Sequence, residues 1–175
     1  MKKTYTRNEL DALDVKFGKL DSVTEDKLPY AADKNHDKVK RELKIVRDEV
    51  NKIRMARDPK ENEYQTKWHE MYKGAAKKDE KGQPIIIGEG QAARYDIGTE
   101  EEVKAFNEKV KALEVEYKEV VDNINKRNVE IQKFMAQPVE LEFHEVPAEY
   151  LDTEGNFTAS KEQLGIIKEL FVRGL

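Results

Sequence analysis

Two stretches of the chain carry apolar residues at alternating intervals of three and four, and this spacing constrains the fold most. It places the apolar side chains on one stripe of an α-helix, and another element must cover that stripe. The sequence therefore predicts long helices that pair along their stripes. The first stripe is Val39, Leu43, Val46, Val50 and Ile53, and the second is Val103, Phe106, Val110, Leu113, Tyr117, Val120 and Ile124.

The second stripe belongs to the longest predicted helix. Thr99 and Glu102 have capping-box spacing, in which the hydroxyl and the carboxylate satisfy backbone amides of the first turn. The stripe continues to Phe134, and Pro138 ends it because proline cannot continue a helix. We therefore expect one unbroken helix of about 35 residues, about 50 Å long, which pairs with the earlier helical run or projects from the body.

Shorter elements are predicted before this helix. A capping box at Thr6–Glu9 begins a short amphipathic helix over residues 7–20, which we interpret as a docking arm. Asp58-Pro59 interrupts the first helical run, and an aromatic stripe with Tyr64, Trp68 and Tyr72 follows it. Residues 85–97 are typical of a β-hairpin with a loose loop.

Two more elements are predicted after the long helix. Alternation of apolar and polar residues over 139–143 indicates a half-buried strand that could join the hairpin in one small sheet. A turn is expected at Gly155-Asn156. Ser160 and Gln163 form another capping box before a last short helix, with Gly174 as its stop.

These elements together predict a mostly helical α+β fold. It is a long antiparallel helical hairpin or coiled coil with a small antiparallel β-sheet and a short C-terminal helix. We expect residues 1–29 to be an N-terminal arm with a short amphipathic helix, and residues 30–175 to form a single domain.

Composition excludes several classes of protein. No apolar run approaches the roughly 18 residues of a membrane span, and Lys2-Lys3 is not followed by the apolar core of a signal peptide. The chain has no cysteine, which excludes disulfides and thiolate metal sites. We therefore expect a protein that neither spans a membrane nor is secreted through a signal peptide.

The net charge of -4 hides an uneven distribution. Residues 34–60 hold ten Lys and Arg against five Asp and Glu, and residues 139–175 hold eight acidic against three basic residues. This pattern suits solvated faces or contacts between like subunits. It also leaves nucleic-acid binding as a lesser alternative, because the basic face lacks interleaved aromatic residues. That alternative rests on Lys40, Arg41, Lys44 and Arg47.

No motif predicts catalysis, a cofactor or a metal. Gly88-Glu89-Gly90-Gln91-Ala92-Ala93 has the glycine spacing of a dinucleotide-binding turn, but no helix follows it directly, so a hairpin loop is the better interpretation. Asp96–Thr99 has the form of a phosphate-loop tetrapeptide, and its Gly-Thr also marks a helix start. His69-Glu70 begins a zinc motif whose second histidine is replaced by Lys73. We expect a non-enzymatic protein.

The order of elements over residues 64–175 resembles an uncharacterised family of small proteins encoded among the structural genes of tailed bacteriophages. The resemblance is carried by Lys78–Pro84, Tyr95–Ile97, the capped helix with Val103, Phe106 and Leu113, the strand at Val139–Leu141, Val146-Pro147, and the last helix with Leu164, Ile167 and Leu170. The resemblance implies a virion or assembly component of the head–tail region, or a packaged protein, located in the virion or the host cytoplasm. It implies no catalytic residue.

The predicted function is therefore that of a phage structural or assembly protein, acting through helix-mediated contacts with other phage proteins or copies of itself. One alternative is an effector that binds and inhibits a host protein, and the second is the nucleic-acid-associated protein described above. Tryptophan and tyrosine are common interface anchors. The expected interface residues are Leu13, Phe17, Tyr64, Trp68, Tyr72, Val103, Phe106, Val110, Leu113 and Tyr117.

Overall fold

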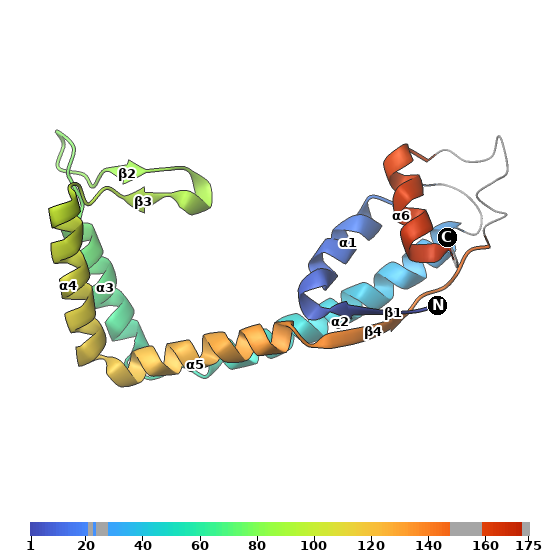
Figure 1. Ribbon diagram of the computed structural model, residues 1–175, viewed down its shortest axis with the longest axis horizontal. Helices are drawn as coiled ribbons and strands as arrows, with labels where there is room; N and C mark the ends of the chain where they lie inside the picture. Colours follow the sequence, from blue (N-terminus) through green and yellow to red (C-terminus); the bar gives the residue numbers. More distant parts are fainter. Residues whose placement is uncertain (21–22, 24–27, 148–158, 173–175) are drawn as a thin grey trace. The chain divides into compact units, whose positions relative to one another are not determined.

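The computed structural model describes residues 1–20, 23, 28–147 and 159–172, which fall into two compact units. Unit 1 comprises Met1–Met55 and Val129–Leu175, and unit 2 comprises Ala56–Asn128. The described residues form six α-helices and two separate two-stranded antiparallel sheets (Figure 1). The predicted mostly helical α+β fold class is thereby confirmed. The predicted turn at Gly155-Asn156 and the predicted stop at Gly174 lie outside the described residues.

Unit 1 is built from both ends of the chain. Its elements are strand β1 (Lys2–Thr6), the 3-10 turn η1 (Arg7–Glu9), helix α1 (Leu10–Gly18), helix α2 (Leu28–Met55), the last turns of α5 (Lys118–Met135), strand β4 (Pro138–Glu142) and helix α6 (Lys161–Phe171).

The sheet of unit 1 differs from the predicted one. Strand β4 pairs with β1, with Lys2 opposite Glu142 and Thr6 opposite Pro138, and it does not join the hairpin. The expected single sheet was wrong because the partner of β4 lies at the other end of the chain. Local periodicity carries no information about such a long-range pairing.

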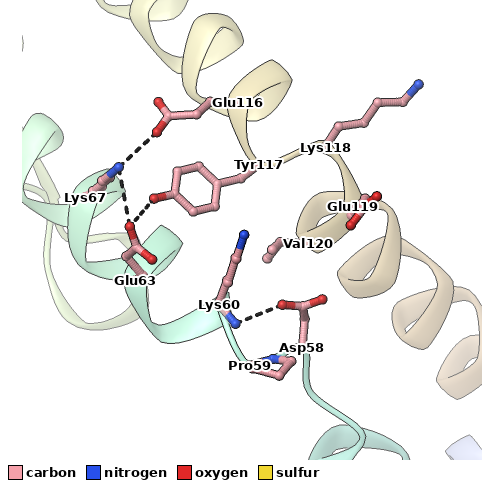
Figure 2. A pocket seen from close by; sticks show the side chains of 10 residues that line it. All are labelled: Asp58, Pro59, Lys60, Glu63, Lys67, Glu116, Tyr117, Lys118, Glu119 and Val120. Carbon is pink, nitrogen blue, oxygen red and sulfur yellow. Dashed lines mark hydrogen bonds and ion pairs between the residues drawn. The ribbon is translucent and has the colours of Figure 1, made fainter.

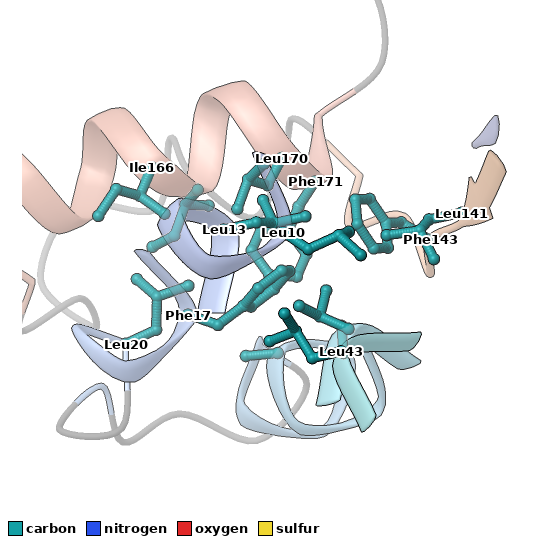
Figure 3. Packing of buried hydrophobic residues seen from close by; sticks show 14 of the residues in the cluster. Leu10, Leu13, Phe17, Leu20, Leu43, Leu141, Phe143, Ile166, Leu170 and Phe171 are labelled. Carbon is teal, nitrogen blue, oxygen red and sulfur yellow. The ribbon is translucent and has the colours of Figure 1, made fainter. Parts of the chain in front are cut away.

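The core of unit 1 lies where α1, α2, α6 and β4 meet (Figure 3). Phe17 packs edge-on against both Phe143 and Phe171, with ring centroids 5.7 Å apart in each pair. Ion pairs from Lys16 to Glu169 and from Lys19 to Glu162, each 2.6 Å long, join α1 to α6 at the surface. Residues 1–20 of the predicted arm are therefore an integral part of unit 1.

Unit 2 contains a pair of helices and a hairpin. Helix α3 (Glu61–Ala75) packs beside helix α4 (Glu100–Glu116), and the first turns of α5 follow α4. Between α3 and α4 the chain forms strand β2 (Ile86–Ile87), the 3-10 turn η2 (Gly90–Ala92) and strand β3 (Arg94–Tyr95). The two strands pair antiparallel, as predicted for this region.

Glycine is required in the hairpin loop. Gly88 has φ +85°, and a Cβ atom at this position would lie 2.6 Å from the carbonyl oxygen of Ala92. The glycine spacing that superficially matches a dinucleotide-binding turn thus serves the close backbone approach within the loop.

The predicted unbroken helix from 99 to 137 was wrong. The chain leaves the helical conformation at Tyr117, where φ is -107° and ψ is 33°, and this residue separates α4 from α5. The Tyr117 amide still donates to the Leu113 carbonyl, and its carbonyl still accepts from Val121. Because no proline or glycine marks the break and the apolar spacing continues across it, the break could not be predicted from local sequence.

Candidate protein-interaction surface

A polar cluster surrounds the break between α4 and α5 (Figure 2). The Tyr117 hydroxyl donates to Glu63 of α3 at 2.5 Å. Lys67 of α3 donates to Glu116 at 2.9 Å and lies 3.5 Å from Glu63. These contacts tie the end of α4 to α3 and close one flank of the helix pair.

The electrostatics of this cluster hold each group in its ordinary charge state. The hydrogen bond from Tyr117 lowers the pKa of Glu63, and the same bond to Glu63 raises the pKa of Tyr117. Interactions with the Tyr117 hydroxyl and then with Glu116 raise the pKa of Lys67. All three shifts move the pKa further from neutrality, so these groups are suited to fixing the helices and not to exchanging protons.

An open pocket of about 760 Å³ adjoins this cluster. Its wall mixes three lysines with four acidic residues, and the charges largely compensate one another. The pocket therefore favours neither an anion nor a cation. The lining residues are Asp58, Pro59, Lys60, Glu63, Lys67, Glu116, Tyr117, Lys118, Glu119 and Val120.

A buried ion pair fixes the start of α3. Glu61, the first residue of α3, accepts a hydrogen bond from Arg127 of α5, and both side chains are about nine-tenths or more buried. Arg57 lies 4.0 Å from the same carboxylate. This pair could not be predicted from the sequence, because the two residues are far apart in the chain and each resembles an ordinary helix-surface charge.

Aromatic rings form a continuous cluster along α3. The Tyr72 ring lies 5.0 Å from Trp68, 5.1 Å from Tyr95 of β3 and 5.3 Å from Phe106 of α4. Tyr64 packs 5.7 Å from Tyr117 at the other end of the pair. All of these residues except Tyr95 were predicted as interface residues, and the hairpin brings Tyr95 to the cluster.

The structure separates the predicted interface residues into two groups. Leu13 and Phe17 are in the core of unit 1, and Phe106, Leu113 and Tyr117 are buried in unit 2, so they serve the fold. The other five are partly exposed, and we call them the exposed stripe. They are Tyr64, Trp68 and Tyr72 of α3 and Val103 and Val110 of α4.

The exposed stripe lies in a unit with little core of its own. The buried apolar side chains described in unit 2 are Ala76, Phe106, Leu113, Tyr117 and Val120. A helix pair with one apolar stripe needs a second layer to cover it, and a core of this size contributes little net stability. Partly exposed tryptophan and tyrosine on such a pair are typical of a protein-contact surface.

The basic face of α2 is exposed but partly engaged. Lys40, Arg41 and Lys44 face solvent, whereas Arg47 forms an ion pair with Asp11 of α1 at 3.1 Å. No aromatic cluster lies beside these lysines and arginines on α2 within the described residues. The basic face of α2 therefore offers positive charge but no aromatic rings on which nucleic-acid bases could stack.

The described residues contain neither a metal-ligand cluster nor a membrane-spanning helix. Among the described residues, no group of three or more histidine, aspartate or glutamate side chains is placed to hold a metal ion. None of the helices in the described ranges is long and apolar enough to cross a membrane.

The chain matches no protein-family model, no curated protein and no solved structure.

Proposed function

We propose that this chain is a non-enzymatic structural or assembly protein that acts through helix-mediated protein contacts, with the exposed stripe of unit 2 as its contact surface. The observation that carries the proposal is that Trp68 and Tyr72 are only partly buried in a unit with few buried apolar residues. Covering these rings would complete the second layer that the helix pair lacks.

The setting we propose is a tailed-bacteriophage particle, either its head–tail region or its packaged contents. Its support is the order of elements over residues 64–175, in which the hairpin, the capped helix α4, strand β4 and helix α6 follow one another as in the phage family that the sequence resembles. The partners would be other phage structural proteins or further copies of the chain.

Quantitative mass spectrometry of purified particles tests this proposal. The chain should be present at a fixed ratio to the other structural proteins, and Trp68→Ala should reduce that ratio severalfold because it removes an anchor of the surface. Tyr30→Ala is the matched control, since Tyr30 is an aromatic residue of unit 1 that is 60% exposed. Particles that lack the wild-type chain would contradict the setting, and equal incorporation of both variants would contradict the surface.

The alternative role, inhibition of a host protein, would use the same exposed stripe. Mass spectrometry of purified particles distinguishes the two roles. A host-directed protein would be absent from particles and would purify from infected cells in a one-to-one complex with a host protein that Trp68→Ala disrupts.

A further inference from the structure

The break between α4 and α5 interrupts a stretch whose sequence favours one continuous helix. Every residue from Glu100 to Met135 except Tyr117 belongs to α4 or α5. The amide and the carbonyl of Tyr117 still bond to Leu113 and Val121. This range contains neither glycine nor proline. The local sequence therefore contains none of the usual causes of a helix break.

The break leaves backbone groups without helical partners. The three amides that follow Tyr117, those of residues 118–120, form no bond to the carbonyls four residues earlier in this described stretch. A side chain often satisfies such groups at a helix end, as Thr99 does at the start of α4. The Tyr117 hydroxyl does not cap either helix, because it donates to Glu63. A continuous helix would regain the missing backbone bonds, so the break has a local cost in free energy.

Contacts from α3 hold the break in place. Figure 2 shows the Tyr117 side chain directed toward Glu63, beside the contact of Lys67 with Glu116. The Tyr117 ring also packs 5.7 Å from the ring of Tyr64 and 4.8 Å from the Lys67 ammonium. We call Tyr117, Glu63, Lys67 and Glu116 the latch. The latch opposes the local preference for a continuous helix.

The latch is exposed enough to open. The side chains of Glu63 and Glu116 are 57% and 60% exposed, and that of Lys67 is 43% exposed. Water competes for exposed charges of this kind, so each such contact contributes little net free energy. Opening the latch exchanges these contacts for the backbone bonds that the break lacks.

We propose that α4 and the first turns of α5 are a two-state element, which is bent while the latch is closed and becomes one continuous helix when the latch opens. The apolar spacing suits the second state, because Leu113, Tyr117, Val120 and Ile124 stay on one stripe of a straight helix. A protein that binds the continuous helix more tightly shifts the balance toward it. The inference concerns the shape of unit 2 and stands whether or not the exposed stripe binds a phage protein.

Spin labels at two positions of the full chain measure this shape. The chain has no cysteine, so N107C/N125C places labels only at these two exposed positions of unit 2. The positions are about five turns apart, so their Cα atoms lie about 27 Å apart on one side of a continuous helix and closer together in a bent one. Double electron–electron resonance should give mainly the shorter distance when the latch is intact.

Tyr117→Ala and Tyr117→Gly are a matched pair in the labelled chain. Both remove the ring and the hydroxyl from the latch, but alanine favours a continuous helix and glycine opposes it. Y117A should therefore move most of the distribution to the distance of the straight helix, and Y117G should give a broad distribution without that peak. Glu63→Ala/Lys67→Ala opens the latch from α3 and should raise the ratio of straight to bent molecules about three- to tenfold.

Asn62→Ala/Thr66→Ala is the control for the double variant, because both residues are exposed on α3 and lie outside the latch. Circular dichroism reports whether each variant keeps its helices. If Y117A loses helix, E63A/K67A decides, since its two positions lie on the surface of α3. A distance distribution in E63A/K67A that equals that of N62A/T66A would overturn the proposal. A straight helix in the chain with an intact latch would also overturn it. Incorporation of Trp68→Ala into particles tests the exposed stripe and not the latch, so the two proposals can fail separately.

Discussion

At the scale of single residues, unit 2 depends on polar contacts that substitute for a large core. The buried pair of Glu61 and Arg127 joins the first turn of α3 to α5. Removing one partner of a buried pair leaves the other charge without compensation, which costs more than the pair itself contributes.

Arg127→Ala should therefore destabilise unit 2 by up to about 3 kcal/mol, because Arg57, 4.0 Å from the Glu61 carboxylate, still compensates part of its charge. Urea unfolding followed by the fluorescence of Trp68, the single tryptophan of the chain, measures this change within unit 2. Lys126→Ala, an exposed neighbour on the same helix, is the control. The double variant Glu61→Leu/Arg127→Leu should recover much of the loss, because two apolar side chains remove both charges together. Equal urea midpoints for R127A and K126A would show that the ion pair of Glu61 and Arg127 does not stabilise unit 2.

A second prediction at this scale concerns the cap of α4. Hydrogen bonds from the Thr99 amide and then its hydroxyl lower the pKa of Glu102 below its ordinary value of 4.5. A carboxylate whose pKa is lowered by folding contributes stability that is complete above the unfolded-state pKa and is lost as the pH falls through the folded-state pKa. Glu102→Gln should therefore be less stable than the wild type at pH 7, with the difference shrinking below about pH 4.

Urea unfolding at pH 7 and pH 3 checks this dependence. Glu101→Gln is the control, because Glu101 lies in the same turn but outside the capping box. A difference between wild type and E102Q that is the same at both pH values would contradict the assigned role of the carboxylate.

The residue contacts that the sequence predicted are the local ones. The capping boxes at Thr6, Thr99 and Ser160 are all present, because each is a contact between residues three apart whose geometry follows from the helix itself. The bonds of Glu61 and Tyr117 to their partners could not be predicted, since they depend on how α3, α4 and α5 pack.

At the scale of elements, the position of a helix followed from the sequence better than its continuity or its partner did. The aromatic stripe with Tyr64 and Trp68 correctly indicated α3, and the β-branched run before Gly88 indicated the hairpin. The break at Tyr117 and the pairing of β1 with β4 arise from tertiary contacts, and no local propensity records them.

Helix α1 offers a direct test of its place in the core. Phe17 is 1% exposed and lies between Phe143 and Phe171, whereas Val15 of the same helix is 61% exposed. Phe17→Ala should reduce the stability of unit 1 by about 3–5 kcal/mol, and Val15→Ala should change it by less than about 0.5 kcal/mol. Thermal unfolding followed by circular dichroism measures both. Similar thermal unfolding midpoints for F17A and V15A would contradict the place of α1 in the core and would support the docking-arm interpretation.

At the scale of the whole molecule, the two units differ in how much apolar surface each buries. Unit 1 encloses aromatic and aliphatic side chains from α1, α2, β4 and α6, and several of them are completely buried. Unit 2 relies on a small cluster of Leu113, Tyr117 and Val120, with Tyr64 and Trp68 only partly covered. Segments with few buried contacts open at lower free energy, and a partner that binds only the folded form stabilises it.

The central claim is that the exposed stripe of unit 2 is covered by another protein in the assembled particle. Hydrogen–deuterium exchange measured by mass spectrometry on the free chain and on the chain in purified particles tests it most directly. The account predicts that amides of Glu61–Ala75 and Glu100–Glu116 exchange faster than those of α1 and α2 in the free chain and become more protected in the particle. Protection of α3 and α4 that equals that of unit 1 in the free chain and is the same in the particle would contradict it.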